Sequence, residues 1–298
     1  MTRPPAYPLA STTPPQNPNN HRTPHPVLPP IDRRPPGRLS RPRLALLAQL
    51  LSPRDRDILA AVGDFRVMSG AQLRRVFWPE GTPETSARLA RHGLTRLEGL
   101  GVLEVLTRRV GGVRGGSGGR VFALGPAGQR LHAPGRRSRR YAPGERHLAH
   151  TLAVAELYVR LTLAQRWDEL EVLRFESEPA CWRPYMGPWG AKLTLKPDAF
   201  VKVGVGDYAY SWFVEIDMAT ESLTTIEHKA RRHIDYHDSG TELRARGVAP
   251  RVAWLAPDQK RAEAIGRALA RLSADERKRF AVSTQDDAFT LLTTGIWS

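Results

Sequence analysis

The chain has 298 residues and a formal net charge of +15, from 45 Lys and Arg against 30 Asp and Glu. A domain uses about 100–200 residues, so this length predicts two domains. No apolar run approaches the roughly 20 residues that a membrane-spanning helix needs. The N-terminus lacks the apolar segment of a signal peptide, and the single cysteine, Cys181, excludes a disulfide framework and a cysteine-rich zinc site. We therefore expect a cytoplasmic protein that does not enter a membrane.

The positive charge is concentrated in the first half of the chain. Residues 1–42 carry +5 and residues 43–144 carry +11, whereas residues 145–298 carry −1. Every cation of the first half is an arginine, and arginine can donate two parallel hydrogen bonds to a phosphate or to a guanine edge. This asymmetry indicates a polyanionic partner, most often nucleic acid. GC-rich codon usage would produce the same excess of arginine.

The first 42 residues are rich in proline. They contain 13 of the 25 prolines. Because proline fixes φ and removes a backbone donor, this density predicts a disordered Pro- and Arg-rich arm over residues 1–42. Its arginines either contact phosphates without sequence preference or belong to a plain unstructured tail.

Three helices are predicted next. Each begins with a hydroxyl side chain that can cap a first turn, at Ser52-Pro53, Ser69-Gly70 and Thr82-Pro83. The third helix is expected to run to about Leu100. Its apolar residues share one face, and Arg88 and Arg91 lie on the opposite face.

Two strands joined by a glycine-rich loop follow the helices. We expect the strands over residues 102–110 and 120–124, and the loop over residues 111–119. Three helices and a two-stranded ribbon are the layout of a winged helix-turn-helix domain, here residues 43–133, in which the third helix enters the major groove of DNA. The predicted DNA-binding residues lie on that helix and on the ribbon: Arg88, Arg91, His92, Arg96, Arg108, Arg109, Arg114 and Arg120. Winged helices also dock proteins, which is the alternative reading.

A basic linker separates this domain from the rest of the chain. Residues 134–144 contain Arg136-Arg137-Ser138-Arg139-Arg140 between glycines and prolines. Such a linker can follow phosphates.

Residues 145–298 are predicted to form an α/β (α+β) domain, a mixed sheet with flanking helices. We expect helices over residues 145–167, 220–236 and 258–272. The expected strands are residues 171–176, 197–203, 208–216, 251–255, 280–283 and 289–292.

Three carboxylates are predicted to meet in this domain. Asp198 begins one strand, and Glu215 and Asp217 end the next. Residues two apart share a face of a strand, and a hairpin would bring Asp198 to that face. Clustered carboxylates are costly unless a cation neutralises them, and Mg²⁺ is a natural partner. The alternative is a strand-end cluster that pairs with basic side chains for stability.

This arrangement resembles the core of the PD-(D/E)xK nucleases. The resemblance implies a metal site of Asp198 and Glu215, with Glu156 as a possible further ligand, and a lysine two residues after the glutamate. Asp217 stands at the position of that lysine. Lys229 or Lys196 would have to supply the ammonium. The catalytic set that the resemblance implies is therefore Asp198, Glu215, Asp217 and Lys229, and the departure at Asp217 puts cleavage in doubt.

Taken together, the motifs are similar to those of the replication-relaxation family of plasmids and integrative elements. They are Leu124-Gly125-Pro126-Ala127-Gly128, His147-Leu148-Ala149-His150, Lys196-Pro197-Asp198, Glu215 to Glu221, and then Lys229 and Tyr236. The resemblance covers about residues 50–255. It implies a DNA-binding accessory protein for replication or relaxation of plasmid DNA, with a relaxase or replication initiator as a possible protein partner.

Histidines on two helices are open to two interpretations. His147 and His150 share one helix face, and His233 and His237 share another. Pairs at this spacing can bind a metal, but the sequence places no third ligand, and hydrogen-bonded helix histidines are more common.

Three hypotheses about function follow from the sequence. The first is an accessory protein that binds double-stranded DNA, with no cofactor and with a second domain that serves as a homodimer, partner or vestigial nuclease module. The second is a Mg²⁺-dependent endonuclease. The third is a winged-helix transcription regulator whose second domain senses a ligand.

Overall fold

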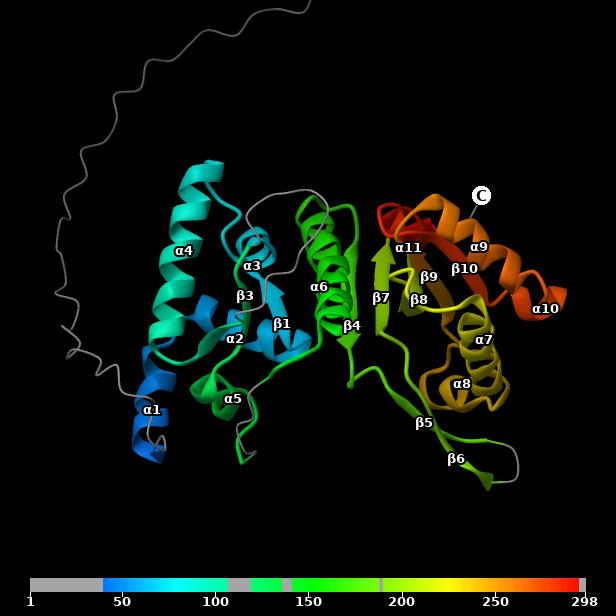
Figure 1. Cartoon of the computed structure of the whole chain (residues 1–298), viewed down its shortest axis with the longest axis horizontal. Coiled ribbons are helices and arrows are strands. Elements are labelled where there is room, and N and C mark those ends of the chain that lie inside the picture. The colour runs from blue at the N-terminus through cyan, green and yellow to red at the C-terminus, as the bar shows by residue number, and fades with distance from the viewer. Residues whose placement is uncertain (1–39, 107–118, 136–140, 188–189, 295–298) are drawn as a thin grey trace, which may run out of the picture. The chain divides into compact units, whose positions relative to one another are not determined.

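The computed structural model describes residues 40–106, 119–135, 141–187 and 190–294 (Figure 1). The residues from Arg38 onward form one compact unit. The predicted arm up to residue 39, three predicted DNA contacts (Arg108, Arg109 and Arg114) and the arginine cluster at 136–140 lie outside the described residues. Within the described part, the protein has the predicted mixed α/β fold, and none of its helices is long and apolar enough to span a membrane.

The first half of the described chain consists of short helices and a small sheet. Its helices are α1 (Arg41–Leu50), α2 (Pro53–Phe65), α3 (Gly70–Phe77), α4 (Pro83–Gly99) and α5 (Pro126–His132). The predicted caps are present: the hydroxyls of Ser52, Ser69 and Thr82 accept from the backbone of the first turns of α2, α3 and α4. Helix α1 was not predicted. Its first two residues, Arg41 and Pro42, belong to the predicted arm, and Pro42 is accommodated because a missing N–H costs little in the first turn of a helix.

The small sheet is antiparallel, with the strand order β1-β3-β2. Its strands are β1 (Val67–Ser69), β2 (Leu103–Leu106) and β3 (Val121–Leu124). Two glycines just after β3 allow α5 to approach the turn after α4. A Cβ on Gly125 would lie 2.4 Å from the carbonyl oxygen of Gly101, and one on Gly128 would lie 2.1 Å from that of Val102. This close approach explains physically why Leu-Gly-x-x-Gly occurs at this point of the chain.

The second half is built around α6 (Glu145–Arg166) and a five-stranded mixed sheet with the order β10-β9-β8-β7-β4. The strands are β4 (Glu171–Ser177), β7 (Ala199–Val205), β8 (Tyr208–Ile216), β9 (Arg251–Ala256) and β10 (Phe280–Thr284). Strands β7 and β8 form the predicted hairpin, and β8, β9 and β10 run parallel. Helices α7 (Leu223–Asp238) and α9 (Gln259–Leu269) pack on one face, while α6 and α11 (Ala288–Thr294) pack on the other (Figure 1).

Several elements of the second half differ from the sequence prediction. Residues 289–292, predicted as a strand, belong to helix α11. A short apolar run does not distinguish a strand from a buried helix by periodicity, and here Leu291 and Leu292 are buried from a helix. The prediction also missed the hairpin β5 (Arg183–Met186) and β6 (Lys192–Leu195), and the helices α8 (Thr241–Arg246) and α10 (Ala274–Arg277).

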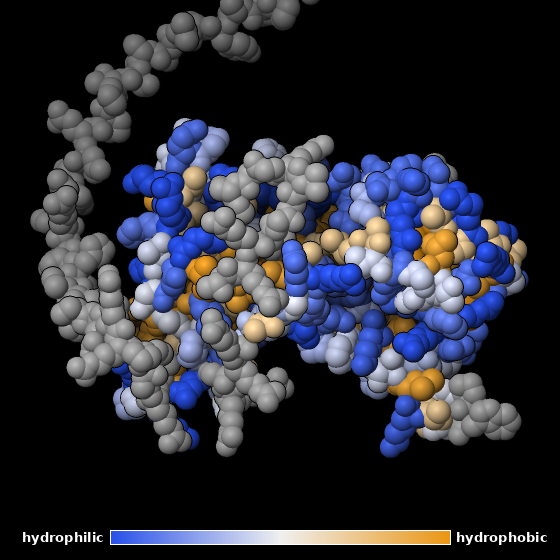
Figure 2. Space-filling view, in the orientation of Figure 1, coloured by the Kyte–Doolittle hydropathy of each residue, from blue (hydrophilic) through white to orange (hydrophobic). Residues whose placement is uncertain are grey.

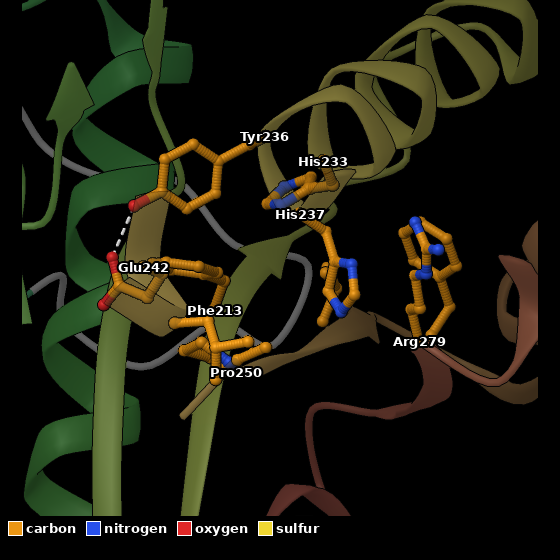
Figure 3. A pocket seen from close by; sticks show the side chains of 11 residues that line it. Phe213, His233, Tyr236, His237, Glu242, Pro250 and Arg279 are labelled. Carbon is orange, nitrogen blue, oxygen red and sulfur yellow. Dashed lines mark hydrogen bonds between the residues drawn. The ribbon is translucent and has the colours of Figure 1, made fainter. Parts of the chain in front are cut away.

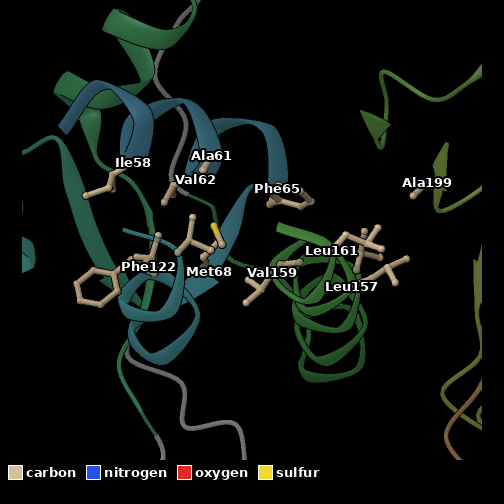
Figure 4. Close-up of a cluster of buried hydrophobic side chains, with 14 of the residues drawn as sticks. Ile58, Ala61, Val62, Phe65, Met68, Phe122, Leu157, Val159, Leu161 and Ala199 are labelled. Atoms are coloured by element: carbon tan, nitrogen blue, oxygen red, sulfur yellow. The ribbon is translucent and has the colours of Figure 1, made fainter. Parts of the chain in front are cut away.

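Helix α6 contributes to one hydrophobic core that runs through both halves. It contacts α3 and β1 of the first half, and β4 and β8 of the second. Figure 4 shows Phe65 beside α6, which carries Val159 and Leu161, and the ring centre of Phe65 lies 4.8 Å from that of Tyr158 on α6. The side chains of Val159 and Leu161 are fully buried. The two halves are therefore joined by apolar packing as well as by the chain.

Candidate functional site

The first candidate site is the outer face of α4. Arg88, Arg91 and His92 are exposed, whereas Ala90, Leu94 and Leu97 on the opposite face are buried. Hydrophilic side chains cover the visible face of α4 in Figure 2. In the described part of the chain, neither Arg88 nor Arg91 forms a salt bridge, so their charge is available to an external anion.

Two other predicted DNA-binding arginines have partners inside the protein. The Arg96 guanidinium lies 2.5 Å from Oδ1 of Asp55, whose carboxylate also closes the N-cap of α2 through Ser52. Arg120 pairs with Glu98 and lies over the ring of Phe122. Arg96 therefore joins α4 to α2, and Arg120 joins β3 to α4.

The second candidate site surrounds Asp198, just before β7. Its Oδ2 accepts a hydrogen bond of 2.7 Å from the backbone N–H of Ile216, at the end of β8. Its Oδ1 lies 3.1 Å from Nε2 of His150 on α6. Burial lowers the pKa of His150, but the hydrogen bond and the charge of Asp198 outweigh burial and raise that pKa above its ordinary value. Of the two histidines on α6, His147 is exposed, whereas His150 pairs with Asp198.

Glu215, on β8, is the most deeply buried carboxylate of this site. Its Oε1 lies 2.8 Å from Nε2 of His233, and its Oε2 lies 3.3 Å from Nζ of Lys229, both on α7. Burial raises the pKa of Glu215, and His233 and Lys229 together outweigh burial and hold it below its ordinary value. Lys229 also pairs with Glu221 at 3.0 Å. Burial lowers the pKa of Lys229, but the surrounding carboxylates outweigh burial and raise it, so the ammonium stays protonated.

The structure thus brings together three of the four residues that were predicted as catalytic: Asp198, Glu215 and Lys229. The fourth, Asp217, is tied elsewhere. Its two oxygens accept from Arg261 on α9 at 2.6 and 3.1 Å. Arg261 also donates to the backbone oxygen of Glu221. Sequence reasoning did not identify Arg261, because an arginine 44 positions away shows no spacing signal.

Glu156 does not join this group either. It accepts hydrogen bonds from Gln72 and Arg75 of α3, and it lies 3.6 Å from Arg160. Its carboxylate therefore holds α3 against α6. Glu156 was expected as a further metal ligand because it lies on the helix before the sheet, but the helix directs it to the first half of the protein.

The carboxylates, as they lie, do not fit a divalent cation. Both oxygens of Asp198 and both of Glu215 already face an N–H donor or the ammonium of Lys229. No three His, Cys, Asp or Glu side chains among the described residues are grouped so that they could hold a metal ion. The site is therefore a network of ion pairs in which the ammonium of Lys229 supplies positive charge. The sequence left this arrangement open as the alternative to a metal site.

A small cavity borders the side chain of His233 (Figure 3). It has a volume of about 20 Å³, which is room for one water molecule. Tyr236 and Glu242 close one side through a short hydrogen bond, and His237 and Arg279 line another. Nδ1 of His233 is buried and has no hydrogen-bond partner among the described residues.

The sequence model of the replication-relaxation family matches residues 59–252, more than half of the chain. The matched segment begins in α2 and ends in β9, so it contains both candidate sites. The comparisons with curated proteins and with solved structures gave no match.

Proposed function

The chain belongs to the replication-relaxation family, and from this premise we propose that it is a DNA-binding accessory protein for replication or DNA relaxation of plasmids or other mobile elements. In this proposal residues 43–133 form a winged-helix domain that binds duplex DNA. The second half positions this domain and serves as a partner module.

The order of elements in the first half supports the winged-helix assignment. Helix α2, strand β1, helices α3 and α4, and strands β2 and β3 follow one another, and the three strands form one antiparallel sheet. In such a domain the third helix, here α4, enters the major groove, and the loop between the last two strands lies near the DNA backbone.

The observation that carries the proposal is the exposed, unneutralised face of α4. Arg88 and Arg91 lie one turn apart on a helix whose other face is fixed in the core. A rigid helix can present two guanidinium groups, which form no salt bridge with any residue that the structure describes, to phosphates and guanine edges.

Fluorescence anisotropy with labelled duplex DNA tests this proposal. Affinity should fall steeply with salt, because contacts between arginine and phosphate release counterions. Reversing both charges (Arg88→Glu with Arg91→Glu) should weaken binding by about a hundredfold or more, since each reversal replaces attraction by repulsion.

The matched control is Lys192→Glu on β6 with Arg232→Glu on α7, two exposed side chains that form no salt bridge among the described residues. It makes the same change of net charge elsewhere in the fold. If both double variants lose DNA affinity equally, the loss is a general effect of charge. If the α4 variant keeps its DNA affinity, α4 is not the helix that contacts DNA.

An endonuclease is the second candidate, because Asp198, Glu215 and Lys229 lie together at the strand ends. The donors and the ammonium that already face Asp198 and Glu215, together with the Asp217–Arg261 pair, count against a bound Mg²⁺, so we propose no cleavage step. Incubation of supercoiled plasmid with the protein and Mg²⁺ or Mn²⁺ tests this candidate. Nicking that is lost in Asp198→Ala would establish it.

A further inference from the structure

The outer edge of the five-stranded sheet carries a further site. Strand β10 is the last strand of the sheet and pairs only with β9 among the described residues. Its sequence, Phe280–Thr284, contains no charge and no proline. Proteins usually protect such an edge with charged residues or proline, because the free backbone groups accept another strand.

The pairing with β9 determines which backbone N–H and C=O groups of β10 point away from the sheet. The N–H of Val252 donates to the oxygen of Arg279, and the N–H of Gln285 donates to the oxygen of Ala256. In a parallel pair, alternate residues of a strand face the neighbour, so the N–H and C=O groups of Phe280, Val282 and Thr284 face away from β9.

An open groove runs along this edge and is lined by residues of α9, β10 and α11. Its volume is about 820 Å³, and the side chains of β10 form its floor. The wall made by α9 contains the small residues Ala262, Gly266 and Ala270 beside Gln259, Glu263 and Leu269. A Cβ built on Gly266 would meet no atom within 4 Å. The groove can therefore admit both a strand and a helix beside α9.

The charges at the two ends of the groove are opposite. Arg277 lies just before β10, is exposed and has no salt bridge among the described residues. Asp287 lies just after β10 and is also exposed. A second copy of the strand running antiparallel would place its Asp287 beside Arg277, and its Arg277 beside Asp287.

We propose that β10 is the dimer interface of this protein, and that its occupant is β10 of a second copy. A two-fold axis at Val282 pairs Val282 with its own copy and Phe280 with Thr284 of the copy, so that all outward backbone groups are satisfied. The same axis brings the two α9 helices side by side with Gly266 between them. Two sheets then form one continuous sheet, and the dimer carries two copies of α4.

Sedimentation velocity of the full chain over a wide range of concentrations tests the interface. The wild-type protein should dimerise. Gly266→Glu should raise the dimer dissociation constant at least about tenfold, because it places two carboxylates in the contact between the α9 helices. The open space around Gly266 lets this variant fold, which the thermal midpoint verifies.

Two matched controls separate the interface from general effects. Gly266→Ala changes the same position but leaves the groove open, and it should dimerise like the wild type. Arg277→Glu should weaken the dimer several-fold, whereas Lys278→Glu, which makes the same change of charge at a neighbour outside the groove, should not.

A protein that remains monomeric at all concentrations would overturn the proposal, and the edge would then be open to a strand of a different protein. A dimer that is indifferent to Gly266→Glu and Arg277→Glu would overturn the location. Because neither measurement involves DNA, these outcomes are independent of the proposed function.

Discussion

Three buried carboxylates, Asp198, Glu215 and Asp217, lie close together in the sequence but have different basic partners in the structure. Asp198 and Glu215 are held by histidines and by Lys229, while Asp217 is held by Arg261 in a bidentate pair. Each carboxylate is nearly or fully buried and each has a donor. A buried charge without such partners would cost several kcal/mol, so these donors offset the cost of burying the three carboxylates.

His150 makes stability depend on pH. Its pKa is raised above 6.5, so the folded protein holds a proton at this position more tightly than the unfolded chain does. The contribution of the His150–Asp198 pair to the free energy of unfolding is therefore complete below about pH 6.5 and is lost as the pH rises through the raised pKa.

Denaturant unfolding at several pH values measures this effect. The wild type should lose stability relative to His150→Gln as the pH rises above neutrality. His147→Gln, on the same helix but exposed, is the control and should follow the wild type. Parallel pH profiles of wild type and His150→Gln would show that the pair does not titrate.

At the scale of elements, the ends of the helices follow local chemistry. Ser52 and Asp55 form a capping box at α2, and Ser69 and Gln72 form another at α3. The carboxylate of Asp55 also accepts a hydrogen bond from the guanidinium of Arg96 on α4. One carboxylate therefore fixes both the start of α2 and the position of α4. The helix proposed to enter DNA is thus oriented by a residue 41 positions earlier in the chain.

Arg96 and Arg91 should respond in opposite ways to substitution. Arg96→Ala leaves the buried carboxylate of Asp55 without its cation and should cost about 1–3 kcal/mol of unfolding free energy, because Arg96 itself is 39% exposed. Arg91→Ala removes an exposed side chain and should change stability by less than about 0.5 kcal/mol while weakening DNA binding. Thermal or denaturant unfolding of both variants, with anisotropy on the same samples, checks this. Equal stability of the two variants would contradict the role assigned to Arg96.

At the scale of the whole molecule, α6 makes the two halves depend on each other. Its apolar residues enter a core that also contains residues of α2, β1 and β7. Polar contacts add to this packing. Glu156 accepts hydrogen bonds from Gln72 and Arg75. Arg166 donates to the carbonyl oxygens of Arg75 and Val76. Helix α3 is therefore attached to α6 at several points.

Leu161→Ala should destabilise both halves together. Leu161 is fully buried in the shared core, and the substitution should cost about 2–5 kcal/mol. Hydrogen exchange of amides in α2 and in β8 should report the same loss of protection. Leu46→Ala, at a side chain that is 58% exposed, is the control and should change little. Loss of protection in one half alone would show that the halves unfold independently.

Most elements could be predicted from the sequence because their signals are local. Capping hydroxyls located the starts of α2, α3 and α4, the Asp258 carboxylate located that of α9, and strand-like runs located β4, β7 and β8. The errors fall where the local signal is ambiguous. Residues 289–292 are too short a run to show a period, and the start of α1, Arg41 and Pro42, falls within the predicted proline-rich arm. The predicted division into four segments and the predicted wing arginines 108, 109 and 114 stay predictions.

The sequence by itself determined the family, the mixed α/β fold, and the fact that the excess of positive charge lies in the first half, because these depend on motifs, periodicity and composition. Only the tertiary structure decided which charges remain free. It neutralised Arg96 with Asp55 and Arg120 with Glu98, left Arg88 and Arg91 exposed, and turned three expected metal ligands into parts of ion pairs with α3, α6 and α7. The physical reason is that a charge acts on what lies within a few ångströms, and residues tens of positions apart in the chain become neighbours only when the core closes.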